Sequence, residues 1–60
     1  MATPWSAVAQ PDGTYEVTQK SRTVEFGLDL DEVESFLRRK KVKDYTLVEE
    51  DGYRTQVVRL

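Results

Sequence analysis

The residues with the clearest chemical potential form a basic cluster in the stretch FLRRKKVK, residues 36–43. Its cations are Arg38, Arg39, Lys40, Lys41 and Lys43. If all of them contacted phosphates of a duplex, the logarithm of the binding constant would fall against the logarithm of salt with a slope of about −4.5, at about −0.9 per contact. One interpretation of the cluster is therefore a nucleic-acid interface.

A second interpretation is that the cluster ends a helix. Asp31, Glu32 and Glu34 precede it, so acids would lie at the start of the helix and bases at its end. In these positions each charge stabilises the helix by about 0.3 to 1 kcal/mol through its interaction with the helix dipole. Successive helical side chains point about 100° apart, so the cations cannot all face one groove. We favour this second interpretation and keep nucleic-acid binding as the alternative function.

The chain contains no cysteine and no histidine, so thiol nucleophiles, triads and the usual zinc sites have no parts. The carboxylates that remain are Asp29, Asp31, Glu32, Glu49, Glu50 and Asp51. They fall at an expected helix start and hairpin turn, and the run DLDE lacks the alternating donors and central glycine of a calcium loop. We expect a protein that is not an enzyme, with no catalytic residue, no cofactor, no metal and no small-molecule substrate.

The chain of 60 residues is predicted to form a single domain, residues 1–60, because its 38% apolar and 33% charged composition is typical of globular proteins. Such a small core rarely contributes more than about 3 to 5 kcal/mol. Because disulfides are impossible without cysteine, we expect dimerisation to provide the additional stability. No apolar run is long enough to span a membrane, and a cytoplasmic location is expected.

The first 28 residues are predicted to form three antiparallel strands. In PWSAVAQPDGTYEVTQ the PDG turn closes a hairpin in which Gln10 faces Thr14. The alternation places Trp5, Ala7, Ala9, Tyr15 and Val17 on one face and Ser6, Val8, Glu16 and Thr18 on the other. The run TVEFGL continues as a third strand, with Val24, Phe26 and Leu28 expected on one face.

A helix is predicted over LDLDEVESFLRRKK because Leu30, Val33, Phe36 and Leu37 recur at helical spacing. Asp29 is the expected N-cap, and Glu32 completes a capping box. Glu34 and Arg38 are expected to form an i, i+4 pair. A base-stacking platform would use Trp5, Tyr15, Tyr45 and Tyr53, but core packing is expected instead, with Tyr53 the most exposed of the four.

The tail YTLVEEDGYRTQVVRL is predicted to be a second hairpin around Asp51 and Gly52. A two-residue loop sets Tyr45 opposite Val58, whereas a three-residue loop sets it opposite Val57, and the sequence leaves both open. Apolar residues fall on both faces. Tyr45, Leu47, Val58 and Leu60 lie on one face and Val48, Tyr53 and Val57 on the other.

The elements follow the order β-β-β-α-β-β, which predicts an α+β fold: a small antiparallel sheet with one amphipathic helix on one face. One helix cannot cover both faces. We therefore expect a protein-interaction module, self-associating as a homodimer through the uncovered face or an edge strand, with Val48, Tyr53 and Val57 as binding residues.

The span from Trp5 to Lys41, PWSAVAQPDGTYEV followed by a third strand and DLDEVESFLRRKK, resembles the AP2-like β-β-β-α arm-binding domain of phage-type integrases. The resemblance implies DNA binding in the major groove through the exposed sheet face. On this chain that face would hold Ser6, Val8, Gln10, Thr14, Glu16, Thr18 and Lys20. In its acidic, cysteine-free composition and its PDG and DG turns, the chain also resembles small uncharacterised proteins of actinobacteria and their phages.

Overall fold

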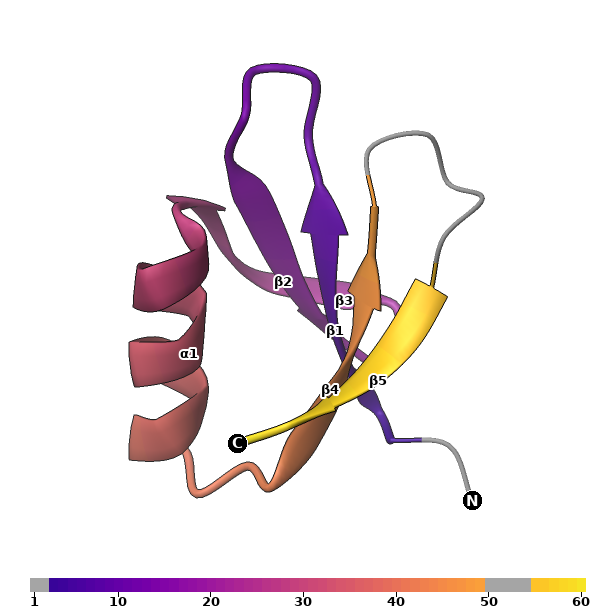
Figure 1. The fold of residues 1–60 in the computed structure, drawn as a ribbon, viewed down its shortest axis with the longest axis vertical. Helices are drawn as coiled ribbons and strands as arrows, with labels where there is room; N and C mark the ends of the chain where they lie inside the picture. Colours follow the sequence, from indigo (N-terminus) through magenta and orange to yellow (C-terminus); the bar gives the residue numbers. More distant parts are fainter. Residues whose placement is uncertain (1–2, 50–54) are drawn as a thin grey trace.

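A computed structural model describes residues 3–49 and 55–60 and shows one helix against a five-stranded sheet (Figure 1). The elements follow the predicted order. They are β1 (Trp5–Ala9), β2 (Tyr15–Gln19), β3 (Arg22–Leu28), α1 (Leu30–Arg39), β4 (Asp44–Val48) and β5 (Thr55–Arg59). The α+β class is therefore confirmed.

The first hairpin forms with the predicted register. The Gln10 N–H donates to the Thr14 carbonyl at 2.8 Å, and the Gly13 N–H donates to the Gln10 carbonyl at 3.0 Å. Gly13 takes a φ of 91°, which a residue with a Cβ adopts at a cost. Ala7 lies opposite Val17, and both are buried, so the face predicted for the core is the core face.

The prediction that Val24, Phe26 and Leu28 share one face is wrong for Phe26, and Val24 is 39% exposed and outside the core cluster. Two register shifts separate β3 from a regular pairing with β2, one on each side of the Val17–Glu25 pair. Each shift adds a residue to β3 and breaks its alternation. Leu28 packs against the core, whereas Phe26 is 73% exposed and lies beside Glu16 and Gln10 on the other face.

The helix begins and ends with recognisable caps. The Glu32 N–H donates to Asp29 Oδ1 at 2.8 Å, and the Asp29 N–H donates to Glu32 Oε1 at 2.9 Å, which confirms the capping box. Val33 and Leu37 are completely buried against the sheet. The helix covers one face only, as predicted (Figure 1).

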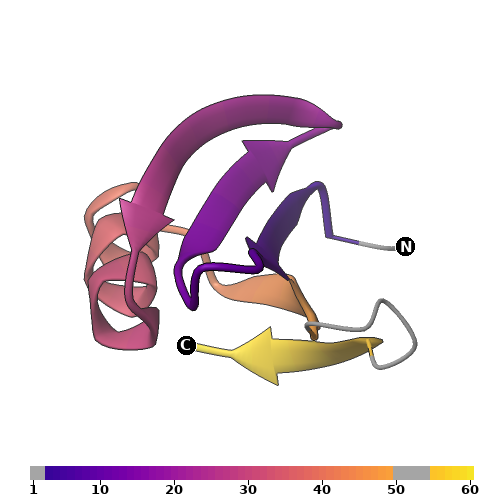
Figure 2. The same cartoon turned by 90° about the horizontal axis from the view of Figure 1, so that it is seen from above.

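The sheet is mixed, so the prediction of a purely antiparallel sheet is wrong. The strand order is β3-β2-β1-β4-β5, and β4 runs parallel to β1, with Ser6 beside Thr46 and Ala7 beside Leu47. The reason is the path of the helix, which carries the chain from β3 at one edge to the free side of β1. There β4 starts from the same end of the sheet as β1 (Figure 2).

The last two strands take the register of the two-residue loop. Tyr45 lies opposite Val58 and Leu47 lies opposite Gln56. The turn itself, including Asp51 and Gly52, lies outside the described residues. Tyr45 and Leu47 are buried, and Val58 and Leu60 pack against the same core, which confirms the predicted inner face.

The core is small and lies between α1 and the inner face of the sheet. It comprises Ala7, Val17, Val33, Leu37, Tyr45 and Leu47, with Trp5, Tyr15, Leu28, Phe36, Val42, Val58 and Leu60 around it. The aromatic residues among these pack against the core, as predicted. Across residues 3–49 and 55–60, no helix is both long and apolar enough to cross a bilayer.

Candidate functional site

The face of the sheet away from the helix is half-buried and mixed in character. Its central strands present Ser6 and Val8 from β1, Thr18 from β2, and Thr46 and Val48 from β4. Ser6 lies between Thr18 and Thr46, so hydroxyl side chains run in a row across the strands. A face of β-branched and hydroxyl side chains is neither a solvated polar face nor a closed core.

The predicted protein-binding residues fall on this face where the structure describes them. Val48 lies opposite Thr55, and Val57 lies opposite Thr46. Val48 is half-buried in the middle of the sheet, whereas Val57, on the outermost strand, is 64% exposed. Tyr53, the third predicted residue, lies outside the described residues.

The two edges of the sheet differ sharply in regularity. At one edge, β3 carries two register shifts and a glycine, Gly27, with a φ of 75°. Bulges of this kind twist an edge away from further pairing. At the other edge, β5 reads TQVVR and pairs with β4 in a single unbroken register. It contains no proline and no bulge, so β5 is the edge able to accept another strand.

The backbone of β5 offers its free hydrogen-bonding groups at three positions. The Leu60 N–H donates to the Lys43 carbonyl at 2.9 Å, so Leu60 directs its backbone toward β4. Because N–H and C=O groups alternate in direction along a strand, Gln56 and Val58 also face β4. Thr55, Val57 and Arg59 therefore direct their N–H and C=O groups outward.

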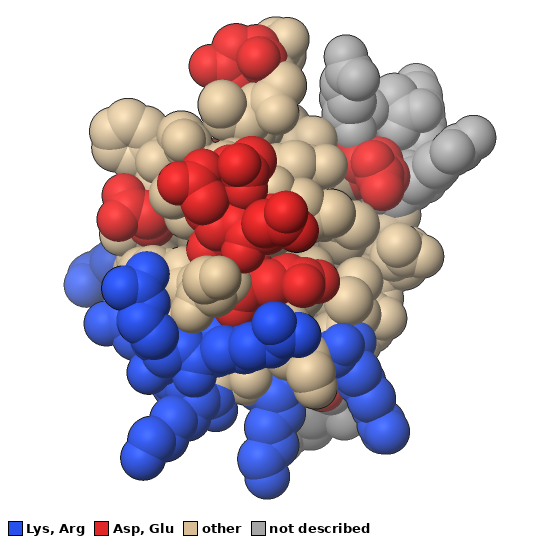
Figure 3. Space-filling model, turned by 60° about the vertical axis from the view of Figure 1, so that its left-hand side comes forward, with Lys and Arg blue, Asp and Glu red and all other residues tan. Residues whose placement is uncertain are grey.

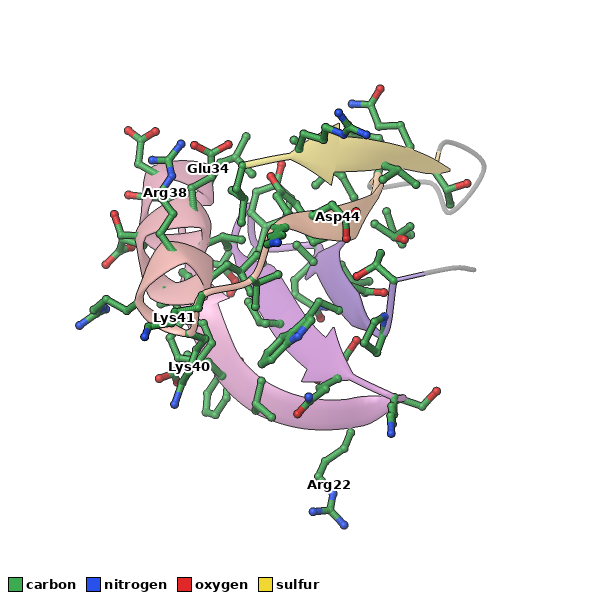
Figure 4. All side chains as sticks on the ribbon, turned by 90° about the horizontal axis from the view of Figure 1, so that it is seen from below. Arg22, Glu34, Arg38, Lys40, Lys41 and Asp44 are labelled. Carbon is green, nitrogen blue, oxygen red and sulfur yellow. The ribbon has the colours of Figure 1, made fainter. Side chains whose placement is uncertain are left out.

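The predicted cationic cluster lies at the end of α1 and in the connection that follows. Arg38 forms an ion pair with Glu34 at 3.9 Å, the predicted i, i+4 pair. The Lys40 ammonium lies 5.6 Å from the centre of the Phe36 ring, within cation–π range. Arg39 and Lys40 border a small surface groove with Glu25. The side chains fan around the helix axis, so they do not converge on one point (Figure 4).

The helix terminates in a Schellman motif with lysine at its left-handed position. The Val42 N–H donates to the Leu37 carbonyl at 3.0 Å, and the Lys41 N–H donates to the Arg38 carbonyl at 3.0 Å. Lys41 has a φ of 61°, where glycine is the usual residue. A lysine there costs about 1 kcal/mol relative to glycine.

Residues other than glycine also adopt left-handed φ values at the turn between β2 and β3. Gln19 pairs with Arg22, which leaves Lys20 and Ser21 as a two-residue loop with φ values of 51° and 67°. Positive φ at both positions defines a type I′ turn, for which Asn-Gly is the preferred sequence. Lys20 and Lys41, the two lysines of the described residues with left-handed φ values, thus both lie where the chain reverses direction.

The carboxylates at the helix start serve local structure. Asp29 and Glu32 form the capping box, and Glu25 accepts a hydrogen bond from the Phe26 N–H at 3.2 Å. A groove of about 260 Å³ between β3 and α1 is lined by these three and by Asp31, among others. Over the described ranges, no group of three or more carboxylates is placed to hold a metal ion.

Among the residues that the structure describes, two side chains have shifted pKa values, and both shifts follow from packing or local hydrogen bonds. Burial raises the pKa of Tyr45, because the phenolate would lose its hydration, and the neighbouring Glu34 carboxylate adds to the shift. Hydrogen bonds from the Thr14 hydroxyl and N–H lower the pKa of Asp12 in the hairpin turn. The Asp12 carboxylate bonds within its own turn, and the Tyr45 ring is buried in the core, so both shifts reflect local structure.

Comparison with known proteins found no matching family model, no matching curated protein and no matching solved structure. The resemblance to integrase arm-binding domains therefore stays a prediction. Of the reading face that it implies, Ser6, Val8, Glu16 and Thr18 do share the uncovered face.

Sequence reasoning missed two features. The first is the contrast between the two edge strands, since β3 carries register shifts and β5 is regular. The second is that Lys20 and Arg22 lie at the same end of the molecule as the helix-end bases. The positive φ values of Lys20 and Lys41 carry no residue-type signal, since neither position holds glycine or asparagine.

Proposed function

We propose that this protein is a non-catalytic interaction module that forms a homodimer through the edge strand β5. The observation that carries the proposal is the asymmetry of the sheet: β3 is doubly bulged, whereas β5 is regular and its outer edge meets no other strand of the described chain (Figure 2). Unpaired edge strands of this kind are templates for pairing with another chain.

A second copy of β5 fits this edge in an antiparallel arrangement. With Val57 on the two-fold axis, Val57 pairs with its own copy, and Thr55 pairs with Arg59 of the partner. All three residues direct their backbone groups outward, so this register forms hydrogen-bonded pairs throughout. No like charges face each other, and the exposed Val57 side chain packs on its symmetry mate.

The distribution of charge also favours a second copy in this orientation. The helix-end bases gather at one end of the molecule, and carboxylates cover the middle and the other end of the face shown in Figure 3. An antiparallel β5 pair reverses one copy relative to the other. Each basic end then lies alongside the acidic end of its partner, which is the favourable arrangement of two dipoles.

The expected dimer is weak. A five-residue edge strand buries much less than the roughly 1,200 to 2,000 Å² of a stable interface. We therefore expect a dissociation constant of about 10 to 1,000 μM, or about 4 to 7 kcal/mol.

Sedimentation equilibrium at concentrations spanning this range tests the proposal. The wild type should shift from monomer to dimer. Val57→Lys should remain a monomer, because two lysines would meet on the axis. Phe26→Lys is the matched control, because it introduces a lysine at a similarly exposed apolar residue of the same face. Phe26 lies on β3, the irregular strand at the opposite edge of the sheet. Phe26→Lys should dimerise like the wild type.

A second variant separates pairing of strands from stacking of faces. Val57→Pro removes an outward N–H and leaves the β4 pairing intact, because proline is tolerated where the missing donor faces solvent. Val57→Pro should abolish the dimer while circular dichroism stays native. A wild type that remains monomeric near 1 mM, or dimers lost equally in Phe26→Lys, would refute the edge-strand dimer.

A further inference from the structure

Lysine and arginine are strongly segregated in this molecule. The chain has nine, and Arg54 alone lies outside the described residues. The others occupy the β2–β3 turn, the first residue of β3, the end of α1, the connection to β4 and the last residue of β5; they are Lys20, Arg22, Arg38, Arg39, Lys40, Lys41, Lys43 and Arg59. We name this region the basic end.

Backbone hydrogen bonds hold the segments of the basic end together. The Lys20 N–H donates to the Pro4 carbonyl at 2.9 Å, and the Leu60 N–H donates to the Lys43 carbonyl at 2.9 Å. The Thr3 hydroxyl donates to the Asp44 carbonyl at 3.0 Å. The β2–β3 turn, residues Thr3 and Pro4, Leu60 and the connection after α1 therefore lie at one end of the molecule, where blue side chains gather in Figure 3.

Some of these cations are already engaged within the protein. Arg38 pairs with Glu34, Lys40 lies over Phe36, and Arg39 shares a groove with Glu25. Among the residues that the structure describes, no carboxylate forms an ion pair with Lys20, Arg22, Lys41 or Lys43. These four are available to a ligand, and Figure 4 shows Arg22 and Lys41 reaching out from different elements.

The backbone at two of these positions points to a role beyond helix termination. Lys20 and Lys41 both adopt left-handed φ values, where asparagine or glycine would cost less. Backbone strain of this kind is concentrated at functional sites. A purely structural turn or cap has no need of lysine at both reversals, and both reversals lie at the basic end.

The spread of the cations identifies the chemistry of the ligand. They do not converge on one point, so a single phosphate or small anion has no site. The molecule measures 27 × 22 × 19 Å, and its basic end is of the order of 20 Å across. A duplex carries one charge per roughly 1.7 Å of its axis, so a surface of this width meets many phosphates of both strands.

A nucleic acid suits this end better than a lipid surface. Stable membrane binding needs an apolar anchor beside the charges. Among the exposed apolar side chains, Phe26 and Leu30 lie near the first hairpin turn and the helix start, and Val57 lies on the edge strand β5. Val24 is nearer to Arg22, but it is only 39% exposed, and a single valine is too small an apolar anchor. The acids of the first hairpin turn and the helix start repel a polyanion, so they orient the molecule with its basic end forward.

We propose that the basic end binds the phosphodiester backbone of duplex nucleic acid through Lys20, Arg22, Lys41 and Lys43, without reading its sequence. None of the four residues belongs to β5, so variants of β5 leave the proposed phosphate contacts in place. Four contacts predict a salt slope of about −3.6, and affinity in the range of non-specific binding, about 10⁻⁴ to 10⁻⁶ M.

Fluorescence anisotropy with a labelled duplex DNA of about two turns, from 50 to 200 mM salt, tests the proposal. Lys20→Asn/Lys41→Gly should raise the urea midpoint of unfolding, because each change relieves left-handed strain. The same variant should bind at least about tenfold more weakly at 50 mM salt and lose about 1.8 from the slope. Greater stability combined with weaker binding is a result that a structural role alone does not produce.

Two comparisons complete the test. Arg38→Gln removes one charge from an ion-paired position and should weaken binding less than Lys41→Gly does. The same duplex in RNA form should bind with a similar slope. Absence of binding to either duplex at 50 mM salt would overturn the proposal, as would unchanged binding by the double variant or binding to phosphatidylserine vesicles alone. Val57→Pro should bind a short duplex as the wild type does, so failure of the dimer leaves this result interpretable.

Discussion

Val57 lies opposite Thr46 on the face of the sheet that the helix leaves uncovered. The backbones of Val57 and Thr46 do not hydrogen-bond to each other. Leu60 and Lys43 form a hydrogen-bonded pair, and such pairs recur at every second residue along antiparallel strands, which excludes Val57. The backbone of Val57 therefore faces away from its own sheet. An exposed valine with outward backbone groups, in a regular strand, is the structural basis of the proposed dimer.

The capping box predicts a measurable loss on substitution of Asp29. Asp29→Ala removes the acceptor for the Glu32 N–H and should lower the free energy of unfolding by about 1 kcal/mol. Asp29→Ser retains a capping oxygen and should cost much less. Urea unfolding followed by circular dichroism measures both, and equal losses in the two variants would show that the cap oxygen is not the stabilising group.

The core predicts a larger effect at Leu37, which is completely buried. Leu37→Ala should lower the free energy of unfolding by about 2 to 5 kcal/mol, through lost burial and the cavity that remains. In a domain of this size that loss leaves a large unfolded fraction at 25 °C. Phe26→Ala, at an exposed site, should change stability by less than about 0.5 kcal/mol. A Leu37→Ala protein as stable as Phe26→Ala would contradict the described core.

The raised pKa of Tyr45 predicts a loss of stability in alkali. Below pH of about 10, the tyrosine is protonated in both the folded and the unfolded state, so it adds no pH dependence. Above that pH the unfolded state releases the proton first, so stability falls until the pH passes the pKa of the folded state. Urea unfolding at pH 8 and about 11 should show a steeper loss for the wild type than for Tyr45→Phe. Parallel losses in the two proteins would rule out this linkage.

The left-handed conformation of Gly27 predicts a cost for any residue with a Cβ. Gly27 has a φ of 75°, and a Cβ there would meet no atom within 4 Å, so the cost is conformational rather than steric. Gly27→Ala should lower the free energy of unfolding by about 1 kcal/mol, and Gly27→Asn by less, because asparagine tolerates this region better. Thermal unfolding compares the two variants, and an alanine variant as stable as the wild type would mean that β3 carries no bulge there.

The parts of the fold that could be predicted from the sequence are those set by local signals. The PDG turn fixed the register of Gln10 and Thr14, and Asp29 with Glu32 marked the helix start. The parallel pairing of β1 with β4 could not be predicted, because it joins Ser6 to Thr46 across 40 positions with no local turn to define it. Phe26 was assigned to the wrong face because a register shift breaks its alternation with Leu28, and the isolated Gly27 between them is the signal in the sequence for such an irregularity.

The candidate site also had parts that local sequence signals predict and parts that depend on the tertiary fold. Val48 and Val57 were placed on the uncovered face from alternation alone, and the helix-end bases from their composition. Lys20 and Arg22 were not joined to those bases, because the β2–β3 turn and the end of α1 meet only through the tertiary fold. The open edge at β5 depended on the strand order, which local pattern does not determine.

The most direct test of the edge-strand dimer uses the absence of cysteine in this chain. In Val57→Cys the two sulfurs would meet on the two-fold axis, where paired Cα atoms about 5.5 Å apart permit a disulfide. In Thr55→Cys the Cα atoms of the new cysteines would lie about 14 Å apart, because they are offset by four residues along the paired strands. Under mild oxidation, we predict rapid and nearly complete covalent dimer for Val57→Cys and little for Thr55→Cys. Equal, slow cross-linking of the two variants would contradict the antiparallel pairing of β5.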